Sequence, residues 1–178
     1  MKLDYTRHYL KWHKNTPSHR DFVSNHYRNL LGSLLPKDPE ARVIDVGCGM
    51  GLALGFLKSS GFKNIEGVDN DPGQIRLAHE AGLPARWIED TIQYLSERKK
   101  SAECVLLLDV LEHIPKAEQI PFLQRIFDVL KPRGRLILTV PNANSALAMR
   151  WRHIDWTHET SFTEHSLDFV LFHAGFQK

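Results

Sequence analysis

The chain has 178 residues, a length that fits one domain, and its hydrophobic content of 42% and charged content of 25% are ordinary for a soluble globular protein. Its net charge of +2 argues against a strong general affinity for nucleic acid or acidic lipid. No apolar run approaches the roughly 18 residues that a membrane-spanning helix needs. The two cysteines cannot form a disulfide framework, so we expect a cytoplasmic protein in a reducing compartment.

The chain opens with a polar and aromatic segment, residues 1–17, that shows no clear periodicity. A helix is predicted over 18–35, because apolar side chains recur there at spacings of three and four. Ser18 and Asp21 have the spacing of an N-terminal capping pair, so we expect the helix to begin at Ser18.

Strand and helix patterns then alternate to the end of the chain. Short apolar or β-branched runs predict five strands, at 42–46, 64–69, 85–88, 104–108 and 135–140. Helical periodicity predicts the connecting and closing helices, at 52–61, 72–82, 91–98, 117–130 and 163–174. This alternation predicts an α/β fold with a doubly wound, mainly parallel sheet, whose ligands bind outside the carboxyl ends of the strands.

Capping residues support two of these helices. Asp71 is predicted to cap the helix after the second strand, with Pro72 in the first helical position and the Gln74 side chain reaching back. Asp90 and Gln93 repeat the capping spacing after the third strand.

A glycine loop follows the first strand, with Gly47, Gly49 and Gly51 at alternate positions. Glycine allows a tight turn and a close approach of the backbone to a ligand. A dinucleotide loop of the G-x-G-x-x-G type would need a glycine at position 52, which is Leu52, and no G-x-x-x-x-G-K-[ST] phosphate loop occurs in the sequence.

Two acidic residues beside the loop indicate which kind of ligand it binds. Asp45, within the first strand, would favour a cationic ligand and repel a pyrophosphate. Asp69 ends the second strand 20 residues after Gly49, the distance at which a carboxylate meets ribose hydroxyls in such folds. These features predict a site for a nucleoside that carries a positive charge and no phosphates, and S-adenosylmethionine fits that description.

The runs at 45–51, 67–69 and 90–91 together resemble the class I S-adenosylmethionine-dependent methyltransferases. The best match is the small-molecule group that includes ubiquinone-pathway and sugar-modifying O-methyltransferases, and it extends over about residues 40–176.

The resemblance implies a place for each part of the cofactor: Gly47 and Gly49 under the methionine part, Asp69 on the ribose, and Asp90 with Thr91 at the adenine. The cofactor-binding residues expected on this basis are Asp45, Gly47, Cys48, Gly49, Asp69, Asn70, Asp90, Thr91, Asp109 and Val110.

The C-terminus departs from the family pattern. Family members continue past the Ala-Gly-Phe run into two more strands, one of them antiparallel, whereas this sequence stops at Lys178. The C-terminal strands are therefore expected to be missing, either because the chain is a fragment or because the protein has lost a sheet edge. An uncovered fifth strand can pair with another chain, so we expect a homo-oligomer through that edge.

A metal site is one hypothesis for the residues after the fourth strand. If the backbone turns helically, Asp109, Glu112 and His113 share a face, and two carboxylates with an imidazole could hold Mg²⁺. The run also resembles the E-x-x-E-H sequence of metal-dependent O-methyltransferases, with Asp109 in the place of the first Glu. The alternative is that these residues only line the cofactor or brace the loop.

The segment after the fifth strand supplies the candidate catalytic residues. His158 is expected to act as general base, because a loop histidine titrates near neutral pH, with Asp155 or Glu159 orienting it. Trp151 and Trp156 could form an apolar or sugar-stacking wall. The alternative is that His158 only bonds backbone in an irregular loop.

The N-terminal segment, residues 1–36, is expected to close as a lid over a cofactor-binding domain that spans 37–178. Its aromatic and basic side chains suit such a lid; they are Tyr9, Trp12, His13, His19 and Arg20. A packed N-terminal helix without ligand contact is the alternative.

The sequence thus predicts a methyltransferase that acts on a small-molecule acceptor, at a hydroxyl group. The loop 155–163 resembles that of bacterial enzymes that modify sugars or envelope-polysaccharide precursors. A non-catalytic S-adenosylmethionine-binding module remains open, as does a protein or nucleic-acid methyltransferase, although no basic stripe and no Asn-Pro-Pro-Tyr motif is present. Leu52 and Asp45 disfavour an NAD-dependent oxidoreductase.

Overall fold

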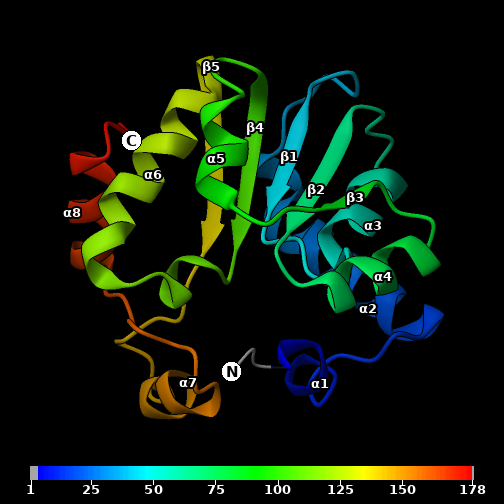
Figure 1. Cartoon of the computed structure of the whole chain (residues 1–178), viewed down its shortest axis with the longest axis horizontal. Coiled ribbons are helices and arrows are strands. Elements are labelled where there is room, and N and C mark those ends of the chain that lie inside the picture. The colour runs from blue at the N-terminus through cyan, green and yellow to red at the C-terminus, as the bar shows by residue number, and fades with distance from the viewer. Residues whose placement is uncertain (1–3, 178) are drawn as a thin grey trace.

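A computed structural model describes residues 4–177, which form a five-stranded sheet flanked by helices (Figure 1). The strands lie in the order β3-β2-β1-β4-β5, and every neighbouring pair is parallel. Their bounds are β1 Val43–Val46, β2 Ile65–Asp69, β3 Ala85–Trp87, β4 Ala102–Leu108 and β5 Leu130–Thr139. The predicted doubly wound parallel sheet is confirmed, and within the described residues β3 and β5 are its two edges.

Helices cover both faces of the sheet. Val43 and Leu106 belong to the core on one face, whereas their neighbours Ile44 and Leu107 belong to the core on the other. Because both faces are buried, the strands read as continuous apolar runs. One face carries α2 (Pro17–Leu31), α3 (Leu52–Ser59) and α4 (Pro72–Glu80), and the other carries α5 (Thr91–Ser96), α6 (Gln119–Val129) and α8 (Glu164–His173).

The start of α4 agrees with the sequence in most respects. The Asp71 carboxylate accepts hydrogen bonds from the N–H groups of Gly73 (2.7 Å) and Gln74 (3.2 Å), and Pro72 occupies the first turn. The predicted return of the Gln74 side chain is wrong, because both of its polar atoms are buried without a hydrogen-bond partner.

The predicted start of α2 is also wrong. The Thr16 side chain, rather than Ser18, caps the helix and accepts a hydrogen bond from the His19 N–H at 3.3 Å. Pro17 opens the helix instead of preceding it, because its fixed φ suits the first helical position and its missing N–H has no helical partner there.

Two short helices fall where the sequence predicted none: α1 (Tyr5–Tyr9) and α7 (Ala148–Ile154). Both project beyond the end of the sheet to which the strands point (Figure 1). Elements of five and seven residues contain too few apolar repeats to be recognised by periodicity. The described chain also has three one-turn 3₁₀ helices, namely η1 (Gly32–Leu34), η2 (Leu111–His113) and η3 (Lys116–Glu118).

The fifth strand begins five residues earlier than predicted, directly after α6. Residues 132–134, between the predicted helix and the predicted strand, form an irregular part of β5: Arg133 has a φ of +67°, and the pairing register with β4 shifts between Ala102 and Cys104. Among residues 4–177, no helix is both long enough and apolar enough to cross a bilayer.

Candidate functional site

The carboxyl ends of the strands bring the predicted cofactor residues to one edge of the sheet. Gly47 follows β1, Asp69 ends β2, Asp90 follows β3 and Asp109 follows β4. Since neighbouring strands are parallel, these positions lie side by side. Figure 1 shows α1 and α7 at this same end of the molecule.

The backbone of the glycine loop folds over the end of β2. The N–H groups of Gly47 and Cys48 donate to the Val68 carbonyl at 2.8 and 3.0 Å, and the Gly49 N–H donates to Asp69 Oδ2 at 2.9 Å. The loop is thereby tied to the carboxylate that was expected to bind ribose.

Asp69 is held on both sides, since its Oδ1 accepts a hydrogen bond from the Asp71 N–H at 2.8 Å. Burial raises the pKa of Asp69, although these backbone hydrogen bonds act in the opposite direction. Each carboxylate oxygen can accept a second hydrogen bond, so the group retains capacity for two ligand hydroxyls.

Asp45 lies beneath this loop without a full set of partners. Its side chain is 2% exposed, and Oδ2 is buried with no hydrogen-bond partner. Burial, together with the nearby charge of Asp69, raises the pKa of Asp45 to about 7. An unpaired buried carboxylate is stabilised by an approaching cation, which is the property predicted for this position.

Gln74 is a polar group of this region that the sequence did not identify as a ligand contact. It is 1% exposed, neither Oε1 nor Nε2 has a hydrogen-bond partner, and a Cβ placed on Gly49 would lie 3.6 Å from Oε1. A buried amide without a partner costs free energy unless a ligand or water satisfies it. We therefore add Gln74 to the candidate site.

The predicted adenine-side residues lie at the ends of β2 and β3. The Asn70 carbonyl accepts a hydrogen bond from Trp87 Nε1 at 3.2 Å. Asp90 caps α5 by accepting from the Gln93 N–H at 3.0 Å, and Thr91 is the first residue of that helix. Asp90 and Asn70 are exposed at the rim of the site.

Cys48 and Val110 lie closer to the loop backbone. Cys48 is buried, and burial raises the pKa of its thiol well above the ordinary value. The Val110 side chain lies so near Gly47 that a Cβ on that glycine would be 2.5 Å from Val110 Cγ2. Gly47, which also has a φ of +74°, is thus required by both conformation and close approach.

The N-terminal helix α1 packs on the glycine loop. Thr6 donates hydrogen bonds to the Asp71 carboxylate from its N–H (3.2 Å) and its hydroxyl (2.9 Å). The Tyr9 ring lies against Gly49, 3.9 Å from the position of a Cβ there, and stacks on His13 with ring centroids 4.5 Å apart.

Other residues expected in the lid are spread more widely. His13 Nδ1 lies 3.2 Å from His19 Nε2, and Arg20 donates to the carbonyls of Met50 (3.0 Å) and Leu77 (3.3 Å). Trp12 is 49% exposed. The structure thus brings Tyr9 and His13 to the glycine loop and places Arg20 as a tether between α2 and the loop.

A hydrogen-bonded chain leads from α1 to the residues after β4. The Tyr5 hydroxyl donates to Asp155 Oδ2 at 3.2 Å, and the Thr157 hydroxyl donates to Asp155 Oδ1 at 2.7 Å. Thr157 Oγ1 in turn lies 2.8 Å from His113 Nδ1. Because the only hydroxyl hydrogen of Thr157 goes to Asp155, His113 Nδ1 must be the donor, which leaves Nε2 as the free lone pair.

Burial, neighbouring charges and hydrogen bonds shift the pKa values of the residues in this hydrogen-bonded series. Burial lowers the pKa of His113 to about 4, with a further contribution from His158. Although burial alone would raise the pKa of Asp155, the hydrogen bonds from Thr157 and the nearby His113 and His8 hold it below its usual value.

His158 is positioned differently from the prediction. Its Nδ1 lies 2.8 Å from the Trp151 carbonyl, so Nδ1 carries the hydrogen and Nε2 the lone pair. Neither predicted orienting residue bonds to it: Asp155 contacts the His113 chain, and Glu159 is exposed. The prediction that Asp155 or Glu159 orients the His158 ring is therefore wrong, because the ring is hydrogen-bonded instead to the backbone carbonyl of Trp151 in α7.

The predicted metal-ligand set is not formed as expected. Asp109 Oδ1 accepts a hydrogen bond from the Thr139 hydroxyl at 2.9 Å, and the donor atoms that approach one another within 4.8 Å belong to Glu112, His113 and His158. Asp109 is excluded because its φ of +53° breaks the helical turn that the prediction assumed.

The donor chemistry of this group does not fit Mg²⁺. Two imidazole nitrogens and one carboxylate are offered, whereas Mg²⁺ prefers an octahedral shell of oxygens. Glu112 is 1% exposed, its two carboxylate oxygens have no partner, and burial with the charge of Asp109 raises its pKa to about 8. Binding of Mg²⁺ there would have to displace a proton that the raised pKa of Glu112 favours.

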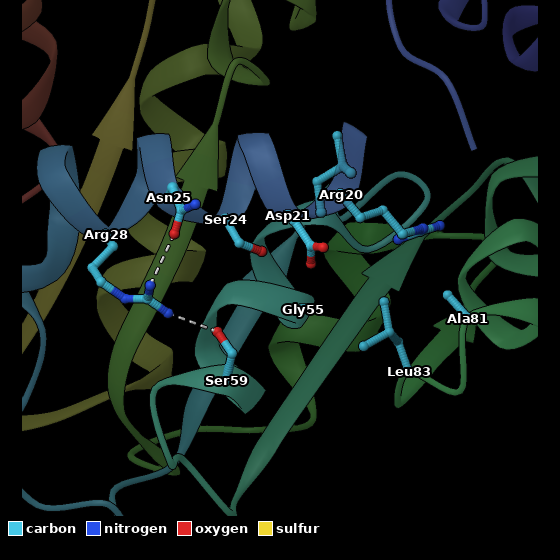
Figure 2. A pocket seen from close by; sticks show the side chains of 10 residues that line it. Arg20, Asp21, Ser24, Asn25, Arg28, Gly55, Ser59, Ala81 and Leu83 are labelled. Carbon is cyan, nitrogen blue, oxygen red and sulfur yellow. Dashed lines mark hydrogen bonds between the residues drawn. The ribbon is translucent and has the colours of Figure 1, made fainter. Parts of the chain in front are cut away.

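The two tryptophans do not form a closed wall, since Trp151 is 43% exposed and Trp156 is 92% exposed. A cavity of about 440 Å³ lies elsewhere, between α2, α3 and the end of α4 (Figure 2). Arg28 spans it by donating to Asn25 Oδ1 (3.0 Å) and Ser59 Oγ (3.1 Å). None of the residues that line this cavity belongs to the predicted cofactor or catalytic sets.

Comparison with solved structures identifies the class of fold. The structure is similar to a SAM-dependent methyltransferase from Archaeoglobus fulgidus, with a TM-score of 0.81 and 24% identity over 98% of this chain and 76% of that chain. It is also similar to the PH0226 protein from Pyrococcus horikoshii, with a TM-score of 0.76 and 19% identity over 97% of this chain and 89% of that one. The fold is that of the class I S-adenosylmethionine-dependent methyltransferases, as predicted.

The sequence comparison places the chain in a family. A family model described as a methyltransferase domain matches residues 19–178, so the chain belongs to that family. A ubiquinone biosynthesis O-methyltransferase of Azorhizobium caulinodans is 32% identical over 127 residues, which cover 69% of this chain and 49% of the relative. The chain spans about half the length of the curated relatives it matches.

Replacing Asp45 by Asn should stabilise the protein without ligand at pH 8. An acid whose pKa rises from about 4 in the unfolded chain to about 7 in the folded one destabilises the fold as the pH increases through that range. Asp45→Asn should therefore raise the thermal midpoint at pH 8 and change it little at pH 4.5, as measured by scanning calorimetry. Asp21→Asn, at an exposed position of α2, should change it little at either pH. A lower midpoint for Asp45→Asn at pH 8 would contradict this account.

Proposed function

We propose that this domain transfers a methyl group from S-adenosylmethionine to a hydroxyl group of a small-molecule acceptor. The observation that carries the proposal is the unpaired, buried carboxylate of Asp45 beneath a glycine loop that is tied to Asp69. A cationic nucleoside satisfies both carboxylates, one by charge and the other through its ribose hydroxyls. Membership in the methyltransferase domain family supports the same reaction.

The cofactor supplies an activated methyl group on a sulfonium, so the protein has to align the acceptor and exclude water. Gly47 and Gly49 let the backbone approach the methionine part, and Asp90 with Thr91 borders the adenine. Gln74, whose amide has no protein partner, provides a donor and an acceptor beside the loop.

An alcohol acceptor must also lose a proton, and His158 is the proposed general base. The Trp151 carbonyl fixes the ring in the tautomer whose Nε2 can accept a proton. The neighbouring His113 ring lies edge-on at a centroid distance of 4.7 Å and is held by Thr157 and Asp155. Asp155 therefore acts on His113 in this proposal, and not directly on the base.

Residues 1–36 are proposed to act as a lid on the cofactor domain at 37–178. The hydrogen bonds from Thr6 to Asp71 and the contact of Tyr9 with Gly49 support this role, because they hold α1 on the predicted methionine site. A closed α1 must move for the cofactor to enter, and its return would exclude water.

The acceptor is proposed to be a small hydroxylated compound, and two classes compete. The names of the curated relatives, ubiquinone biosynthesis O-methyltransferases, favour methyl transfer to oxygen on a compound of that biosynthesis. The loop from Asp155 favours a sugar or an envelope-polysaccharide precursor. A non-catalytic S-adenosylmethionine-binding module and a protein or nucleic-acid methyltransferase are the alternatives that an assay has to separate.

The compartment and the assembly are further parts of the proposal. Cys48 and Cys104 are both free and buried, which suits the reducing cytoplasm.

Strand β5 lies at an edge of the sheet, which suits self-association through that edge. Light scattering over a dilution series should show a concentration-dependent mass, and a strictly monomeric species would contradict the edge pairing.

Calorimetric titration tests the proposed cofactor directly. S-adenosylmethionine and S-adenosylhomocysteine should both bind, and NAD⁺ should not, because its pyrophosphate would meet Asp45. Asp45→Asn should weaken the binding of S-adenosylmethionine, whose sulfur is positively charged, more than the binding of S-adenosylhomocysteine, whose sulfur is uncharged. Binding of NAD⁺, or no binding of either adenosyl compound, would refute the proposal.

A panel of phenolic, sugar and nucleotide-sugar acceptors, followed by release of S-adenosylhomocysteine, tests the reaction and its base. With the acceptor found, His158→Ala should lower kcat by roughly 10²–10⁴, the contribution usual for general base catalysis, with little change in the KM for the cofactor. His165→Ala, at a histidine side chain that is 92% exposed, serves as the matched control. Full turnover by His158→Ala would remove His158 from the mechanism.

A further inference from the structure

Large apolar side chains gather on two exposed segments beyond the carboxyl ends of the strands. One segment follows α1 and the other comprises α7 with its flanks. Their exposed apolar residues are Leu10, Trp12, Leu147, Met149, Trp151 and Trp156. Exposure reaches 72% for Met149 and 92% for Trp156, the highest values among the large apolar side chains of residues 4–177.

The two segments are in contact with each other, and we call their exposed apolar side chains the apolar rim. Asp155, at the end of α7, accepts a hydrogen bond from Tyr5 of α1 at 3.2 Å, and its Oδ2 lies 3.4 Å from His8 Nε2. Figure 1 shows α1 and α7 next to each other and beyond the sheet. A flat partner could therefore contact both segments at once.

Basic side chains are interleaved with the apolar ones. Arg7, Lys11, Lys14 and Arg150 are exposed on these segments, against the exposed acids Asp4 and Glu159. Basic stems cover apolar surface while their charged ends meet anionic groups, and tryptophan favours the boundary between headgroups and acyl chains. The near-neutral net charge of the chain, which argued against a general affinity for acidic lipid, conceals this local excess.

A second exposed apolar group differs in charge. Phe169 and Phe172 of α8 are 59% and 71% exposed, but the exposed ionisable side chains of that helix are Glu164, His165, Asp168 and His173. Within α8, Glu164–His173, there is no arginine or lysine to meet an anion. The contrast makes α8 an internal reference for the apolar rim.

We propose that the apolar rim docks the domain on an anionic lipid surface, with the open end of the sheet facing the bilayer. The argument uses the rim alone and goes beyond the proposed methyl transfer. Docking of this kind combines burial of a few apolar side chains in the headgroup region with attraction between basic side chains and anionic lipids. The docked orientation would present the site to acceptors that reside in, or diffuse along, a membrane.

Co-sedimentation of the full chain with vesicles tests the proposal. Binding should be stronger to phosphatidylcholine vesicles that contain phosphatidylglycerol than to phosphatidylcholine alone, and it should weaken as NaCl screens the charges. Trp156→Ala should lower the partition coefficient about tenfold, and Lys11→Glu with Lys14→Glu should abolish the preference for anionic lipid. Phe172→Ala, on the reference surface of α8, should leave binding unchanged.

Several outcomes would overturn the proposal. One is no binding to the anionic vesicles, and another is an equal loss of binding in Trp156→Ala and Phe172→Ala. A third is that Trp156→Ala changes the molecular mass seen by light scattering, which would make the rim a contact between copies of the chain. Equal competition by a short unstructured RNA would assign the basic side chains to nucleic acid.

Discussion

The buried Asp45 carboxylate is the constraint on which the rest of the site depends. Its Oδ2 has no partner, and its pKa is raised to about 7 by burial and by Asp69. A fold retains such a destabilising group only if another part of the protein, or a ligand, compensates for it. The glycine loop follows directly after the strand that carries Asp45 and is fixed to Asp69, so one ligand can contact the loop and both acids.

The sheet and its helices could be predicted because their information is local. β4 is a continuous apolar run buried on both faces, and Asp71 with Pro72 marks the start of α4. α1 and α7 were missed because helices of five and seven residues are not stable alone. They are held by tertiary contacts, from Thr6 to Asp71 and from Tyr5 to Asp155, which have no signature in either segment.

In the site, too, some residues could be placed from the local sequence and others depend on tertiary contacts. Gly47, Asp69 and Asp90 could be placed from the sequence because parallel strands align their carboxyl ends. The partner of His158 could not be predicted, since Asp155 and Glu159 were both within reach in the sequence and only the folded backbone brings the Trp151 carbonyl to the ring. Gln74 was read as a capping residue, and its lack of any partner is visible only once the loop is folded.

Asp155 connects the two sides of the site. It accepts one hydrogen bond from Tyr5 of α1 and another from Thr157, which is itself hydrogen-bonded to His113. Closure over the cofactor and alignment of the histidines are therefore linked through one carboxylate. The most direct test of the central claim is a crystal structure with S-adenosylmethionine bound. The account predicts ribose hydroxyls on Asp69 and the cationic end of the ligand on the Asp45 side of the glycine loop. An adenosyl group bound elsewhere, with this loop left bare, would contradict it.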